Sequence, residues 1–171
     1  MLVAEPAGAA PWTFDLLEKE HALSKEGRPV ARVRLLKGGA AEVTVGVVPF
    51  GVESDRRGRH FVLTFEGVEV ARAQQPAAWR RRLLVLVRGA MLDRARAAPG
   101  AADVPLVLQA EHALGRTFEV RSGTRRVGRL RPRSPFTTRT EITLPPYLPP
   151  AVQAFLFALV AVQWRRAKKQ G

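Results

Sequence analysis

The hydrophobic pattern divides the chain into two unlike parts. From residue 12 to residue 144, short alternating or β-branched apolar runs are interrupted by Gly, Pro and charged residues, which predicts strands joined by turns. From residue 151 to residue 164 the chain is apolar nearly throughout, which predicts a helix with no polar face. The pattern therefore predicts a mainly β protein with one terminal helix.

The first part contains about eleven predicted strands. They cover residues 13–17, 21–25, 30–36, 41–49, 60–65, 68–73, 82–87, 104–109, 117–121, 126–131 and 138–144. Two Ala-rich stretches, 77–82 and 90–98, also have the composition of short helical turns.

Some of these strand pairs resemble one another. Residues 23–32 and 63–72 both read Leu-x-x-Glu-Gly-x-x-Val-Ala-Arg. Residues 85–94 keep the Gly, the apolar residue three positions later and the Arg five positions later, and residues 118–129 keep them with one residue inserted. Each unit predicts a hairpin whose Gly takes positive φ at no steric cost. A repeated hairpin favours a barrel or stacked sheets over alternating strands and helices.

The terminal helix is predicted over about residues 149–169, beginning at Pro150 after a Pro-rich stretch. It ends in four cations, Arg165, Arg166, Lys168 and Lys169, which suit the negative end of the helix dipole. A helix that is apolar on every side belongs inside a protein or a bilayer. Its apolar run rises by roughly 21 Å, less than the ~30 Å hydrocarbon core of a membrane, so the protein interior is expected and a membrane tail is the alternative.

The composition narrows the class of protein further. There is no Cys, which excludes disulfides, thiol catalysis and cysteine metal sites. Residues 1–11 lack the basic and apolar regions of a secretory signal, so we expect a flexible lead-in before a single domain over residues 12–171. A cytoplasmic location follows, with attachment to the inner membrane face left open.

The charge is the unusual property of this composition. Lys and Arg number 28 against 15 Asp and Glu, which gives a net charge of +13. Such an excess points to a polyanionic partner, either nucleic acid, an anionic membrane face or an acidic protein.

The arginines are concentrated in a few segments, and these are the candidate anion-binding residues. Between residues 121 and 139 there is no acid, and the arginines are Arg121, Arg125, Arg126, Arg129, Arg131, Arg133 and Arg139. Two further groups contain Arg56 and Arg57, and Arg80 and Arg81. In a strand, Arg129 and Arg131 would point outward and Leu130 inward. Guanidinium groups bind phosphate oxygens in pairs, although arginines also occur as polar cover on the outside of a barrel.

Signatures of chemistry are missing from the sequence. The three His are far apart, and no nucleophile motif, metal-ligand spacing or phosphate-binding Gly-rich loop is present. We therefore expect a protein that is not an enzyme and that holds no metal or cofactor.

Together, the hairpin units, the last of which is Val127-Gly-Arg-Leu130, and the ending 142–166 resemble the tubby C-terminal-like superfamily. That superfamily includes the phospholipid scramblases and the LURP-one-related proteins, and the chain is similar to a bacterial member. The resemblance implies a closed antiparallel barrel of about 10 to 12 strands around a buried C-terminal helix. It carries over the fold and a basic outer face, but no calcium-dependent scrambling, because the acidic segment and the cysteines of scramblases are absent.

The resulting hypothesis is a lipid-binding module that docks to anionic phospholipid through arginine patches. The alternatives are a nucleic-acid-binding or protein-interaction scaffold and a protein tethered to a membrane by its C-terminal helix. Nucleic acid is the second choice, because Phe136 is the only aromatic residue between residues 121 and 139 that could stack on a base.

Overall fold

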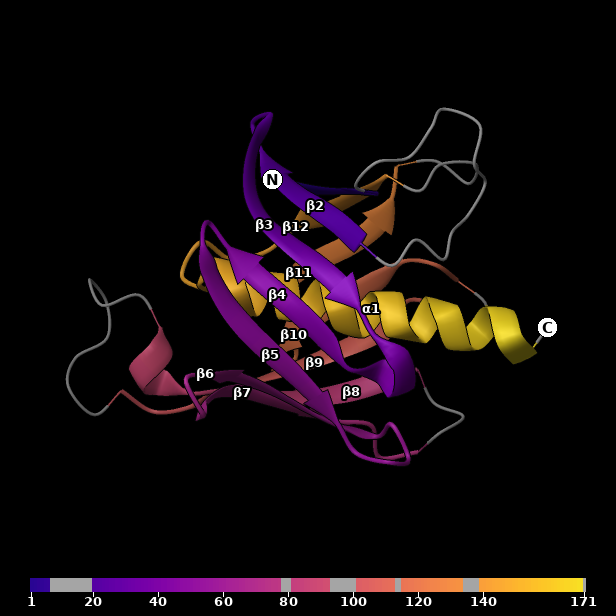
Figure 1. Ribbon diagram of the computed structural model, residues 1–171. Helices are drawn as coiled ribbons and strands as arrows, with labels where there is room; N and C mark the ends of the chain where they lie inside the picture. The colour runs from indigo at the N-terminus through magenta and orange to yellow at the C-terminus, as the bar shows by residue number, and fades with distance from the viewer. Residues whose placement is uncertain (7–19, 78–80, 93–100, 113–114, 134–138, 171) are drawn as a thin grey trace.

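The computed structural model describes residues 1–6, 20–77, 81–92, 101–112, 115–133 and 139–170. Within them, twelve strands form a closed antiparallel barrel, and one helix, α1 (Pro150–Gln170), runs through it (Figure 1). The structure therefore confirms the predicted fold class.

The strands follow the chain around the barrel, and each is paired with the next. They are β1 (Leu2–Pro6), β2 (Glu20–Lys25), β3 (Arg28–Leu35), β4 (Ala41–Val45), β5 (Val48–Ser54), β6 (His60–Phe65), β7 (Val68–Gln74), β8 (Arg82–Val87), β9 (Val104–Ala110), β10 (Phe118–Ser122), β11 (Arg125–Pro132) and β12 (Thr140–Thr143). Two 3₁₀ turns, η1 (Lys37–Gly39) and η2 (Gly89–Met91), lie in connections.

The barrel closes through its first strand, which the sequence analysis missed. In β1, Leu2 and Val3 pair with Ile142 and Glu141 of β12, so no strand edge is left open at this seam. The expectation of a flexible lead-in is wrong for residues 2–6, because Leu2 and Ala4 are buried in the core. Residues 7–11 and the predicted strand 13–17 lie outside the described residues.

The predicted strand 41–49 is two strands. A turn at Gly46, where φ is +60°, separates β4 from β5, and the exposed Val47 of that turn hides the break in the hydrophobic pattern. The prediction of a hairpin turn within residues 85–94 is also wrong, because Gly89 belongs to the 3₁₀ turn η2 and is buried. A Cβ on Gly89 would collide with the carbonyl of Ala101, so close packing explains this glycine.

The other repeated units are hairpins of one kind, β2–β3, β6–β7 and β10–β11. Gly27, Gly67 and Gly123 take φ values of +76°, +78° and +59°. In each hairpin the register shifts just before the turn. The residues left unpaired by these bulges are Val30, Val70 and Val127.

The residues after each bulge follow a shared rule. The next residue is small and buried, namely Ala31, Ala71 and Gly128, and the following arginine points outward. At Gly128 a Cβ would come within 2.7 Å of the carbonyl oxygen of Thr143, so the backbones approach too closely for a side chain. The repeated Val-Ala/Gly-Arg sequence therefore encodes a bulge, a small buried residue and an outward arginine.

The interior of the barrel is filled by α1. Eight strands enclose a space that side chains alone can fill, whereas twelve leave a wider lumen. From Ala151 to Val162 every residue of α1 is buried except Gln153, which is half-buried and donates from Nε2 to the carbonyl of Leu148 at 2.7 Å. Phe155 and Leu156 have no exposed surface. The apolar helix is thus core, as predicted, and no helix in the described part of the chain has the length and apolarity needed to cross a membrane.

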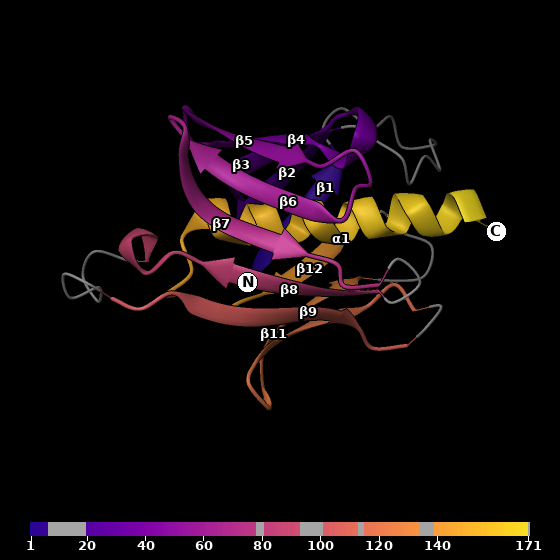
Figure 2. The same ribbon diagram turned by 90° about the horizontal axis from the view of Figure 1, so that it is seen from below.

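The up-and-down order places the connections alternately at the two ends of the barrel. The described residues of the connections that follow β3, β5, β7, β9 and β11 lie at the end where the C-terminal part of α1 emerges (Figures 1 and 2). The bulged hairpins turn at the opposite end.

Candidate functional site

The end of the barrel from which α1 emerges is rich in cations. We call the described residues of the connections after β3, β5, β7, β9 and β11, together with residues 163–168 of α1, the basic rim. Its cations are Lys37, Arg56, Arg57, Arg59, Arg81, Arg116, Arg133, Arg139, Arg165, Arg166 and Lys168. Among the described residues of the rim, the acids are Asp55 and Glu111, and Glu111 is already paired with Arg129 of the wall at 2.7 Å. The rim therefore carries a large uncompensated positive charge.

Several rim guanidinium groups bind backbone carbonyls of a neighbouring connection. Arg59 donates from Nε to Gln75 O at 3.3 Å and from Nη2 to Pro76 O at 2.6 Å. Arg81 donates from Nη1 to Gly115 O at 2.6 Å. A carbonyl oxygen satisfies a donor without cancelling its charge, so these contacts fix the loops and leave the cations electrostatically available.

The end of α1 is held in the rim by the same kind of contact. Arg165 donates from Nη1 to Leu36 O at 3.4 Å, and the indole Nε1 of Trp164 donates to Arg116 O at 3.1 Å. Arg166 donates from Nη1 to Gln75 Oε1 at 3.2 Å. The helix thereby ties together connections that are far apart in the sequence.

Aromatic rings lie beneath three of the cations. The guanidinium carbon of Arg166 is 5.6 Å from the ring centroid of Phe61, and those of Arg116 and Arg81 are 5.6 Å and 4.9 Å from Trp164 and Phe118. Cation–π contacts of this kind orient the guanidinium groups without neutralising them.

Three of the rim arginines are partly buried. Burial lowers the pKa of Arg81, Arg116 and Arg166 below its ordinary value, and the charge of Asp55 partly counteracts this for Arg166. All three stay protonated near neutral pH, because an arginine starts from a very high pKa. A charge with less water around it attracts an approaching anion more strongly than one in bulk solvent.

Asp55 organises the β5–β6 connection. Its Oδ1 accepts the backbone N–H groups of Arg59 at 2.6 Å and His60 at 3.1 Å. These hydrogen bonds, with that to His60 first, lower the pKa of the Asp55 carboxyl. Arg56 and Arg57 lie in the loop between Asp55 and Arg59. Both are exposed and have no partner in the part of the chain that the structure describes. A cavity of about 480 Å³ lies beside this loop.

The predicted arginine segment 121–139 does not form one basic face. Arg129 and Arg131 point outward and Leu130 inward, as predicted, but the two arginines pair with Glu111 at 2.7 Å and Glu141 at 3.0 Å. Arg121 lies 3.4 Å from Glu119.

The remaining arginines of that segment are divided between the two ends of the barrel. Arg125 and Arg126 are exposed where β11 leaves the β10–β11 turn, at the end opposite the rim, and Arg133 and Arg139 belong to the rim. The acids that pair with Arg121, Arg129 and Arg131 lie in the connection after β9 (Glu111), on β10 (Glu119) and on β12 (Glu141). The 121–139 segment contains no acid of its own, so its sequence alone could not reveal these pairs.

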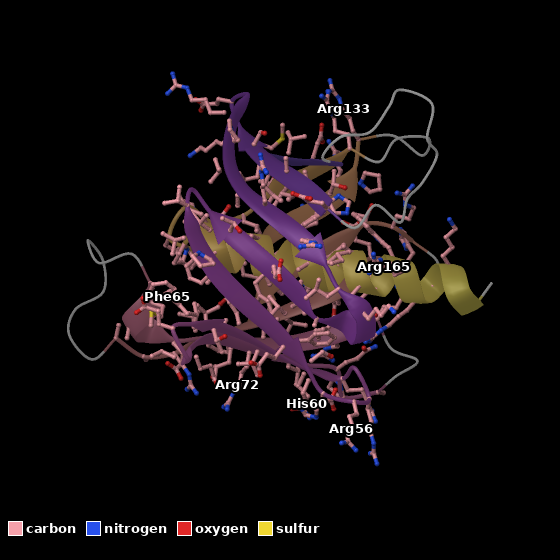
Figure 3. The ribbon with its side chains drawn as sticks, viewed as in Figure 1. Arg56, His60, Phe65, Arg72, Arg133 and Arg165 are labelled. Atoms are coloured by element: carbon pink, nitrogen blue, oxygen red, sulfur yellow. The ribbon has the colours of Figure 1, made fainter. Side chains whose placement is uncertain are left out.

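The other predicted arginines fit the rim better. Arg56, which Figure 3 labels, belongs to it, as do Arg57 and Arg81, whereas Arg80 lies outside the described residues. The sequence analysis did not select Lys37, Arg116, Asp55 or Gln75. The alternation of connections in a meander would have indicated the first two, since every second connection lies at the same end.

The three histidines belong to different elements of the structure. His21 is buried, with its ring centroid 5.1 Å from that of Phe157, while His60 and His112 lie in or beside two different connections of the rim. Among the described residues, no group of three or more His, Asp or Glu side chains is placed to hold a metal ion.

Comparison with known proteins adds no relative. Neither a scan against protein-family models nor a search of curated proteins finds a match to this chain.

Proposed function

We propose that this protein is a non-enzymatic binding module that docks its basic rim onto the anionic phospholipid surface of a membrane. The observation that carries the proposal is the convergence of cations from five connections and from α1 on one end of the barrel. Charges on one end of a rigid body face a planar partner together. Each Lys or Arg near an anionic leaflet contributes on the order of 1 kcal/mol, so a few of them give reversible binding.

The apolar surface of the described residues supports a lipid partner over single-stranded nucleic acid. Sequence-independent binding of single strands uses exposed aromatic rings on which bases stack. The large hydrophobic residues that are exposed here are aliphatic, namely Met1, Val47, Val48, Val68 and Leu84. Phe61 and Phe118 at the rim are buried, and Trp164 is half-buried, with an arginine over each ring.

Vesicle flotation tests the proposal. The protein is expected to float with phosphatidylcholine vesicles that contain phosphatidylglycerol, to stay behind with pure phosphatidylcholine, and to dissociate as salt is raised. The triple variant Lys37→Gln, Arg133→Gln, Lys168→Gln removes three exposed rim cations whose side chains form no hydrogen bond or ion pair with another described residue. At about 1 kcal/mol each, binding is expected to fall about 100-fold.

A matched variant separates location from total charge. Arg28→Gln, Arg125→Gln, Arg126→Gln removes three exposed cations from the opposite end of the barrel, and it is expected to bind within about threefold of the wild type. Equal losses in both variants would overturn the assignment to the rim. Binding to duplex DNA in a mobility-shift assay without vesicle binding would replace lipid with nucleic acid.

A further inference from the structure

We infer that the cavity beside the β5–β6 connection binds a phosphomonoester group, and that the proposed docking selects lipids with such a headgroup. That the ligand is a lipid rests on the proposed function. That the cavity can bind a phosphomonoester rests on separate observations, namely the volume and the lining residues of a pocket within the rim.

The cavity is lined almost entirely by polar side chains. Its residues come from the β5–β6 connection and from the end of β7 with the residues after it, and they include Asp55, Arg56, Arg57, Arg59, His60 and Gln75. The volume of about 480 Å³ exceeds that of one phosphate group and leaves room for the start of its ester. Figure 3 shows Arg56 and His60 side by side at this corner of the barrel.

The wall of the cavity is held in place before any ligand arrives. Asp55 closes the loop by accepting two backbone N–H groups, and a main-chain hydrogen bond of 2.9 Å from Gly58 N to Asp55 O tightens it. Arg59 is fixed by the carbonyls of Gln75 and Pro76. A fixed wall lowers the entropy that binding would otherwise lose.

The free donors are at the mouth of the cavity. Arg56 and Arg57 are adjacent, exposed and without a partner among the described residues, so both guanidinium forks are available for phosphate oxygens. Arg59 keeps its Nη1 donors, because the two carbonyls take only its Nε and Nη2. One acid, Asp55, faces these three cations, and its Oδ1 is already occupied by backbone donors.

This charge balance selects the class of anion. A phosphomonoester carries about −1.5 to −2 charges near pH 7 and presents three acceptor oxygens. A phosphodiester headgroup carries one charge and has two free oxygens. The cavity has cations in excess and several unused donors, so it favours the monoester.

The first arm of the experiment compares two lipids. Vesicles that contain phosphatidic acid and vesicles that contain phosphatidylglycerol are matched in surface potential and titrated with protein. One additional charge-assisted hydrogen bond predicts about tenfold tighter binding to phosphatidic acid. Arg56→Gln, Arg57→Gln is expected to lose this preference, and its binding to phosphatidylglycerol is expected to weaken only as much as that of the charge-matched rim variant Lys37→Gln, Lys168→Gln, which keeps the preference.

The second arm uses a soluble monoester and separates this inference from the docking proposal. Glycerol 3-phosphate is titrated while amide resonances are followed by NMR, and the shifts are expected at Arg56, Arg57 and Gly58 and to vanish in the double variant. If glycerol 3-phosphate causes these amide shifts but the protein does not bind vesicles, the cavity binds a soluble phosphomonoester and the docking proposal is overturned. If the protein binds vesicles of both lipids equally well and glycerol 3-phosphate causes no amide shifts, the cavity is not a phosphomonoester site, while the docking proposal stands.

Discussion

The side-chain amide of Gln163 on α1 donates from Nε2 to Oε1 of Gln75, 3.2 Å away and buried within the barrel mouth. The same oxygen accepts from Arg166 at 3.2 Å. A polar contact between the helix and the wall therefore lies just above an apolar lumen, where a donor that lacked its acceptor could not turn to water.

Replacing Gln75 with Ala removes the acceptor of both donors. We expect Gln75→Ala to lower the free energy of unfolding by about 1–3 kcal/mol, because the Gln163 amide would stay buried without this partner. Gln74→Ala is the matched control, since Gln74 is its exposed neighbour, and a change within about 0.5 kcal/mol is expected. Urea denaturation followed by circular dichroism measures both, and equal effects would contradict the role given to Gln75.

Gly58 tests the fit between Arg166 and the β5–β6 loop. A Cβ at this position would collide with Nη2 of Arg166, and φ is +62°. Gly58→Ala is expected to lower the free energy of unfolding by about 2 kcal/mol, in part through the strained φ and in part by displacing Arg166.

Gly27 provides the control for this substitution. Its φ is +76° and a Cβ there would meet nothing within 4 Å. Gly27→Ala is therefore expected to cost only the backbone term of about 1 kcal/mol. If thermal denaturation shows no difference between the two variants, Arg166 does not occupy the place that the structure gives it.

Phe155 tests whether α1 is the core of the barrel. It has no exposed surface, so Phe155→Ala leaves a cavity inside a closed wall that cannot collapse onto it. We expect a loss of about 3–5 kcal/mol in the free energy of unfolding, against less than about 0.5 kcal/mol for the exposed Lys168→Ala. Truncation after Leu148 is expected to abolish cooperative unfolding altogether. A truncated protein that unfolds cooperatively would show that the wall is stable without its helix.

The pH dependence of stability reports on Asp55. Its pKa in the folded protein lies below the ordinary value of 3.8, so the folded state favours the ionised carboxyl. The stabilisation is fully present above that ordinary value and is lost as pH falls through the lowered pKa. Asp55→Asn is expected to lower Tm near neutral pH, and the difference from the wild type should shrink once the pH drops below about 4.

The control for this profile is a carboxylate on the adjoining strand. Glu53 is exposed at the end of β5, and Glu53→Gln is expected to follow the wild-type profile. If the difference in melting temperature between the wild type and Asp55→Asn stays the same down to pH 3, the lowered pKa of Asp55 does not contribute to stability as stated.

The features that sequence predicted well are those with a long or repeated pattern. The apolar run from Ala151 to Val162 could only be buried, and the Glu-Gly turns at Gly27 and Gly67 required positive φ. Short strands with a weak pattern were missed, as at Leu2 and Ala4, where two inward residues are too few to establish a period.

The site was only partly predictable for a different reason. Arg131 and Glu141 are ten positions apart, and only the register of β11 against β12 makes them neighbours. Conversely, Arg56, Arg81 and Arg166 belong to segments that look unrelated until the order of the strands is known. The net charge can be counted from the sequence, but whether nearby arginines reinforce one another or are neutralised by acids depends on which strands pair.

The pairing of β1 with β12 also governs when this barrel can form. Because β1 pairs with β12, the barrel cannot close during synthesis until residue 143 has left the ribosome. The helix that fills the barrel is synthesised still later. Until then ten intervening strands have no lumen to face, and their apolar sides are open to wrong partners. Slow, late assembly is the expected behaviour of contacts so distant in sequence.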